Sequence, residues 1–201
     1  MIGFNSEKCF EEYKACYQKL LKKYYPAHRS TGFTERNQSV NFTRAVSAIY
    51  PMSFSWFEAA LIKPKQHMDV VIFVPEIDGA LLVESKRFST PHSKVKSVAE
   101  DIQRLCDKNN HQTLCSELKG EYRRCKQNIY GIILADVWLE NDMKNEIYDF
   151  WDNGFFEKFK DLCPVPAETI RDMNNKKWFK TTNNDFDDLK YRLLALMFQI
   201  M

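Results

Sequence analysis

Three charged residues able to support hydrolysis lie within a largely apolar stretch of the chain, residues 68–88. Asp69 opens this stretch, and Glu84 and Lys86 lie near its end, two residues apart, so that in a strand they project from one face. Two nearby carboxylates repel each other unless a cation lies between them, and their hard oxygens suit Mg²⁺ or Mn²⁺. A metal can polarise a phosphate, and a lysine beside it can orient water or hold negative charge. The pattern therefore predicts metal-dependent hydrolysis at phosphorus.

The same stretch predicts the β-hairpin that would position these side chains. Two runs rich in Val, Ile, Leu and Phe flank the segment Pro75–Gly79, and Asp78 followed by Gly79 is a strong turn signal. A turn centred near Ile77 and Asp78 would place Asp69 opposite Lys86 and close to Glu84. All three would then project from one sheet face at the open end of the hairpin.

Hydrophobic spacing predicts the remaining elements, and their order indicates an α/β fold with a central mixed sheet and helices on both faces. The first two predicted helices end at Pro26 and Pro51, respectively. The nearly continuous apolar run at 129–139 indicates a buried strand. The full prediction is a helix at 6–25, a helix at 34–50, a strand at 54–62, the hairpin, a helix at 94–108, a loop or short helix at 109–119, the strand at 129–139, and helices at 142–161 and 185–200.

The spacing of Asp69 from Glu84-Ser85-Lys86 within a hairpin resembles the D…(D/E)XK signature of the PD-(D/E)XK nuclease superfamily. The family core, αβββαβ, is similar to the order predicted here for about residues 34–139. The resemblance implies a single restriction-endonuclease-like domain over 1–201, with helical additions at 1–30 and 142–201. It also implies Asp69 and Glu84 as Mg²⁺ ligands, with Mn²⁺ as an alternative, and Lys86 as a water-orienting or charge-stabilising base. Met68 stands where the motif has its proline.

Glu35 resembles the acidic residue that the family often carries on the helix before the sheet, which implies a third metal ligand. Helical spacing supports this, because position 35 shares one face with Phe42, Val46 and Ile49. The alternative is a first-turn acid favoured by the helix dipole. Two weaker candidates are Glu58, a further ligand or a surface residue, and Gln103, which resembles a glutamine near the active site of some members.

Charge and cysteine content limit the classes of partner. The formal net charge is only +2, so a nucleic-acid partner requires locally clustered cations. The six cysteines lack zinc-knuckle spacing, and the first residues lack an apolar signal region, which favours free thiols in the cytoplasm. The longest apolar runs are too short to cross a membrane, so a membrane partner is not expected.

Together these features predict an Mg²⁺-dependent endodeoxyribonuclease of the restriction, defence or DNA-processing kind. DNA is the expected partner, and the chain would act as a homodimer or as a subunit of a larger complex. A second hypothesis is a catalytically silent nuclease fold that binds nucleic acid or regulates another protein, because a fold does not by itself imply a function. A third is a structural domain in which Lys86 pairs with Asp69 and Glu84 as a buried ion cluster.

Overall fold

A computed structural model describes most of the chain. The described residues are 3–23, 35–63, 66–88, 95–116, 118–138, 177–180 and 191–200. The predicted helix at 142–161 lies outside them. None of the described helices has the length and apolar composition needed to cross a membrane.

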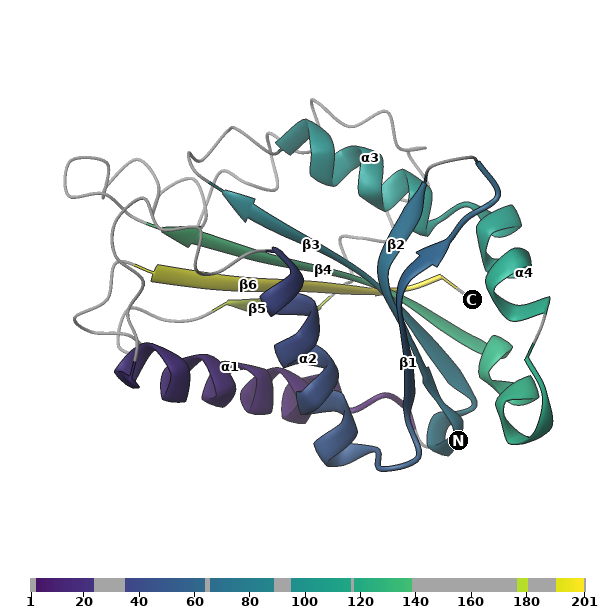
Figure 1. The fold of residues 1–201 in the computed structure, drawn as a ribbon, viewed down its shortest axis with the longest axis horizontal. Helices are drawn as coiled ribbons and strands as arrows, with labels where there is room; N and C mark the ends of the chain where they lie inside the picture. Colours follow the sequence, from purple (N-terminus) through teal and green to yellow (C-terminus); the bar gives the residue numbers. More distant parts are fainter. Residues whose placement is uncertain are drawn as a thin grey trace.

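The described elements form an α/β fold around one six-stranded mixed sheet, as predicted (Figure 1). In space the strands follow the order β1-β2-β3-β4-β6-β5. The elements are α1 (Ser6–Lys23), α2 (Glu35–Ile49), β1 (Phe54–Ala60), β2 (His67–Val74), the short 3₁₀ helix η1 (Pro75–Ile77), β3 (Gly79–Phe88), α3 (Val95–Leu105), α4 (Lys108–Ser116), the 3₁₀ helix η2 (Gly120–Lys126), β4 (Asn128–Trp138), β5 (Lys177–Lys180) and β6 (Tyr191–Gln199).

Strands β1, β2 and β3 form an antiparallel meander at one side of the sheet. The tight connection between β2 and β3 confirms the predicted hairpin, with Asp78 in the left-handed conformation at φ 50°. Strand β4 lies parallel to β3, and the intervening α3, α4 and η2 provide the crossover that a parallel pair requires. The predicted order αβββαβ is therefore confirmed from α2 to β4.

Helices cover both faces of the sheet, as predicted (Figure 1). On one face, Tyr13 of α1 and Phe42 of α2 belong to a buried cluster with Ile72 and Leu81 of the hairpin. On the other face, the apolar side of α3 packs against alternate hairpin residues that include Phe73 and Leu82. The side-chain alternation of the strands thus separates two cores, and the charged residues lie where the two cores end.

The predicted helix at 185–200 is wrong over residues 191–199, which form strand β6 between β4 and β5. The run YRLLALMFQ is apolar almost throughout, and such a run has no clear periodicity to separate a buried helix from a strand buried on both faces. The pairing of residues 191–199 with β4 shows that the run is a strand. β6 completes the ladder of β4 from Tyr130 to Trp138, and its Leu193 and Leu196 join opposite cores.

The pairing of β4 with β6 can be tested at Gly131, which faces Phe198 across the ladder. A Cβ at position 131 would lie 2.4 Å from the Phe198 ring. We expect Gly131→Ala to lower the free energy of unfolding by about 1–3 kcal/mol, because the ring must shift within a packed core. Urea denaturation would measure the loss. Gly3→Ala is the control, since a Cβ there meets nothing within 4 Å, and equal stability of the two variants would contradict the β4–β6 contact.

Candidate active site

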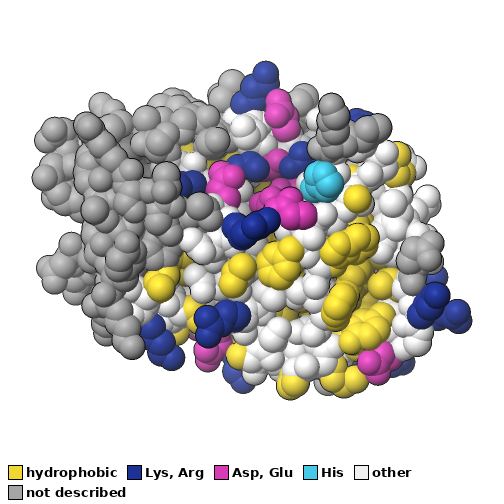
Figure 2. All heavy atoms as spheres, viewed as in Figure 1, with side chains coloured by type: hydrophobic (Ala, Val, Ile, Leu, Met, Phe, Trp, Pro, Cys, Tyr) yellow, Lys and Arg dark blue, Asp and Glu magenta, His cyan; other side chains and the backbone are white. Residues whose placement is uncertain are grey.

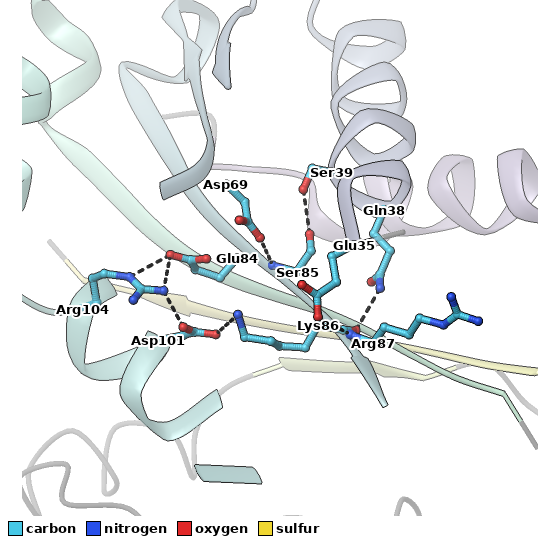
Figure 3. A network of polar contacts seen from close by, with 10 residues as sticks. All are labelled: Glu35, Gln38, Ser39, Asp69, Glu84, Ser85, Lys86, Arg87, Asp101 and Arg104. Atoms are coloured by element: carbon cyan, nitrogen blue, oxygen red, sulfur yellow. Dashed lines mark hydrogen bonds and ion pairs between the residues drawn. The ribbon is translucent and has the colours of Figure 1, made fainter. Parts of the chain in front are cut away.

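The four residues predicted for the site come from three elements and meet at one end of the sheet (Figure 3). Glu35 is the first residue of α2, Asp69 lies in β2, and Glu84 and Lys86 lie in β3. The register differs from the prediction. Val70 pairs with Val83, so the next step places Asp69 opposite Glu84 rather than opposite Lys86. The reason is the connection, in which η1 and Asp78 fill the four positions between the closing pair Val74 and Gly79.

Helix α3 supplies two residues of the site that sequence reasoning missed. The Glu84 side chain is 1% exposed, and its Oε1 accepts a hydrogen bond of 3.0 Å from Nε of Arg104. A second guanidinium nitrogen of Arg104 lies 2.8 Å from the same oxygen and also contacts Asp101. Asp101 in turn forms an ion pair of 2.7 Å with Nζ of Lys86. A continuous series of ion pairs, Glu84–Arg104–Asp101–Lys86, therefore joins β3 to α3.

A weak sequence signal could have identified Asp101 and Arg104. The apolar face of α3 carries Val98, Ile102 and Leu105, and position 101 follows Val98 by three residues, so its side chain lies on the inward face. A carboxylate there needs a buried cation. Gln103, the candidate suggested by resemblance, is instead exposed.

Side chains of helix α2 contact β3 on its other face, mostly at the β3 backbone. Glu35 accepts a 3.0 Å hydrogen bond from the backbone N–H of Arg87, and Ser39 shares one of 2.8 Å with Ser85. The Gln38 amide donates to the carbonyl of Lys86 and to Asp136 of β4, each at 2.9 Å. These contacts fix the direction of β3 where Glu84 and Lys86 project. They also give the buried Asp136 a structural partner.

A hollow of about 260 Å³ opens beside this cluster, between α2 and the sheet. Its lining combines three carboxylates with one cation, one hydroxyl and one aromatic ring: Glu35, Glu58, Asp69, Arg36, Ser39 and Phe57. Glu58 forms an exposed pair of 3.3 Å with Arg36, and its carbonyl lies 3.3 Å from Nδ1 of His67. Figure 2 shows acidic side chains gathered at this place on the surface.

Glu58 has an unusual backbone conformation for a residue inside a strand. Its φ is 53°, in the left-handed region that non-glycine residues seldom adopt. Such strained positions cluster at functional sites, where the surrounding structure enforces them. The distortion lies next to Asp69, at the step where Phe57 pairs with Val70 and Ala59 pairs with Met68. It places the Glu58 side chain at the rim of the hollow.

Burial raises the pKa values of three carboxyl groups in the cluster, those of Glu84, Asp69 and Asp101. Burial and the nearby Asp101 and Asp69 raise the pKa of Glu84 to about 8, although Arg104 and Lys86 oppose the shift. Burial also raises the pKa of Asp69, against the hydrogen bond of 2.7 Å that Asp69 accepts from the backbone N–H of Ser85. The pKa of Asp101 is raised mainly by burial as well. Burial alone would lower the pKa of Lys86, but the combined attraction of Asp101, Glu84 and Asp69 raises it.

The cluster contains four carboxyl groups, those of Glu35, Asp69, Glu84 and Asp101, and Lys86 and Arg104 form ion pairs with two of them. Oxygen donors of this kind suit a divalent cation. Within the described ranges, however, no three His, Cys, Asp or Glu side chains are arranged to hold one ion. The donors thus have suitable chemistry, while Arg104 occupies one oxygen of the expected ligand Glu84.

The comparisons with known proteins give no relative from which a role could be carried over. No family model matches the sequence, and neither a curated protein nor a solved structure matches it.

The raised pKa of Glu84 predicts how stability depends on pH. Between its usual value of 4.5 and about 8, the folded state holds a proton that the unfolded state has released. Stability therefore falls as pH rises through this window, by up to about 1.4 kcal/mol per pH unit. We expect Glu84→Gln to remove this dependence, so that the variant gains stability relative to the unchanged protein from pH 5 to pH 8.

Urea denaturation at several pH values would measure the effect. Glu100→Gln is the matched control, because Glu100 lies on the exposed side of α3. A Glu84→Gln variant whose pH profile parallels that of the unchanged protein would show that Glu84 ionises normally in the folded state.

Proposed function

We propose that this chain is a metal-dependent nuclease that hydrolyses phosphodiester bonds of DNA, with a restriction-endonuclease-like core from α2 to β4. One observation carries the proposal: Asp69 and Glu84 lie one residue beyond the last pair of β2 and β3, Val70 and Val83, and Glu35 and Lys86 converge on the same end of the sheet. This is the juxtaposition that the D…(D/E)XK signature implies. The order αβββαβ supports the proposal at the level of the fold.

We assign metal binding to the carboxylates of Asp69, Glu84 and Glu35, with Mg²⁺ as the expected ion and Mn²⁺ as a substitute. Both contacts from Arg104 fall on Oε1 of Glu84, and Figure 3 shows the second oxygen of Glu84 on the side toward Asp69. That oxygen is the one we assign to the cation. When bound, the ion would polarise the scissile phosphate and lower the pKa of an attacking water.

The side chains of the protein would orient and stabilise the reacting groups. Asp101 holds Nζ of Lys86 at the end of the series of ion pairs, so the ammonium group stays protonated and close to the carboxylates. A protonated lysine in this place can donate a hydrogen bond to a phosphate oxygen as negative charge develops. Glu58, at the rim of the hollow, is a further oxygen donor within reach of the substrate side of the site.

A second candidate function, a silent nuclease fold that binds nucleic acid or regulates another protein, is favoured by one specific observation. Arg104 already neutralises Glu84, as an internal cation would in a site that no longer binds metal. The two functions differ in one measurable property. A silent site binds without cutting, whereas the proposed nuclease cuts only when a divalent metal is present.

Cleavage of supercoiled plasmid and of single-stranded DNA, with Mg²⁺, with Mn²⁺ and with a chelator, would test the proposal. We expect metal-dependent cutting that falls at least about 100-fold in Asp69→Asn, Glu84→Gln and Lys86→Met, because each removes a charge at the reacting phosphate. Calorimetric titration with Mn²⁺ should show weaker binding to Asp69→Asn.

Glu100→Gln and Lys96→Met are the matched controls, since they remove an exposed ion pair on α3. Cutting by the site variants at the rate of these controls would refute the site. An unchanged protein that binds DNA but leaves every substrate intact would favour the silent function.

A further inference from the structure

Strand β1 displays three large aromatic side chains to solvent. Phe54 is 54% exposed, Trp56 is 43% exposed and Phe57 is 37% exposed. β1 lies at the edge of the sheet, with β2 on its only paired side within the described sheet. Figure 2 shows hydrophobic side chains gathered over β1, beside the acidic group at the hollow. Exposed apolar side chains concentrated in this way indicate a binding surface rather than ordinary surface composition.

The aromatic residues connect the candidate active site to a second region of the molecule. Phe57 lines the hollow together with Asp69. Toward the other end of β1, the Phe54 ring stacks on Phe73, with centroids 6.3 Å apart, and meets the ring of Tyr122 in η2 edge-on at 6.1 Å. Because side chains alternate along a strand, Phe54 and Trp56 project from one face of β1, and Phe57 projects from the other face, where it lines the hollow.

Positive charge lies at one end of this aromatic strip. Next to Tyr122, η2 carries the exposed cations Arg123, Arg124 and Lys126. Arg124 also pairs with Asp78 at 3.1 Å. At the other end, Arg36 is paired with Glu58 and three carboxylates line the hollow, so this end is acidic. Aromatic faces beside a group of cations match a ligand made of flat bases joined by phosphates.

A second copy of the chain fits this edge less well. Pairing of two edge strands needs a regular ladder of backbone donors and acceptors. The left-handed Glu58 interrupts that regularity within β1. An apolar protein surface would also leave the cations of η2 without negatively charged partners, whereas phosphates supply such partners.

We propose that β1 and η2 form a binding surface for single-stranded nucleic acid, defined by Phe54, Trp56 and Phe57 with Arg123 and Lys126. Bases stack on Phe54 and Trp56, phosphates contact η2, and the bound strand passes over the exposed edge of β1 to Phe57 and the hollow. The inference rests on the proposed nuclease function for this last step, because it names an unpaired strand as the substrate class delivered to the site. Stacking tolerates any sequence, so the surface selects unpaired bases and not particular ones.

Fluorescence anisotropy would test the proposal, with a labelled oligothymidine and a duplex of equal length, in a chelator that prevents cutting. We expect tighter binding of the single strand, quenching of Trp56 fluorescence, and binding weakened about 5- to 100-fold in Trp56→Ala but largely retained in Trp56→Phe. Ile62→Ala is the matched control, since Ile62 is equally exposed outside the strip. In Arg123→Gln/Lys126→Gln the slope of log affinity against log salt should fall by about 1.4.

Equal binding by Trp56→Ala and Ile62→Ala, or equal affinity for duplex and single strand, would overturn the inference. If the unchanged protein still cut duplex DNA, the proposed function would survive that failure. Binding that depends on Trp56 in a protein inert toward every substrate would support the binding surface and refute the nuclease. A Trp56→Ala variant that becomes monomeric by light scattering, with its affinity for the oligonucleotide unchanged, would assign the strip to dimer contact and overturn the inference.

Discussion

The packing of four carboxylates around two cations, at the point where the two apolar cores end, is the constraint on which the site and the neighbouring helices depend. Taking charged groups out of water costs several kcal/mol for each ion, and apolar side chains of similar volume would pack there with equal or greater stability. The raised pKa values of Asp69, Glu84 and Asp101 record this cost. This arrangement does not favour folding by itself, yet it extends through three layers of the fold. Costly arrangements of this kind are typical of functional sites.

The contacts within the cluster are of two kinds, and they have different consequences. Glu35, Gln38 and Asp69 bond to the backbone of residues 85–87, so they fix the path of β3. Glu84 and Lys86 instead pair with side chains on α3. The first group of contacts therefore fixes the backbone of β3, whereas the second fixes only its side chains. In the proposed nuclease a cation would bind the second oxygen of Glu84, while Arg104 stays on Oε1 and Asp101 keeps Lys86 in place.

The sequence predicted those features that depend on local chemistry. The turn at Asp78, the hairpin and the order from α2 to β4 follow from residue types and periodicity, and all three are confirmed. The convergence of Glu35, Asp69, Glu84 and Lys86 was also expected, and the structure brings them together. Features set by distant pairing were not predicted. The apolar run of β6 can be told from a helix only by its pairing with β4. The hairpin register depends on how many residues of the connection η1 takes up. Asp101 and Arg104 were missed because charged residues on a helix usually face solvent, whereas here Lys86 and Glu84 of β3 provide partners for a buried Asp101 and a half-buried Arg104.

The electrostatics also limit how any polyanion could reach the site. The chain as a whole carries a formal charge of only +2, and the hollow is lined by three carboxylates, so its own field repels phosphate. A nuclease with such a site needs attraction from elsewhere on its surface, and a cation among the carboxylates, before a backbone can approach. The exposed cations of η2 and the aromatic strip of β1 lie outside the acidic cluster, yet they join it through Phe57. Binding energy gained from stacking does not depend on the charge of the hollow. In the proposed nuclease it would hold a strand at the rim while a metal neutralises the carboxylates beneath, and the aromatic edge and the acidic site would then act together.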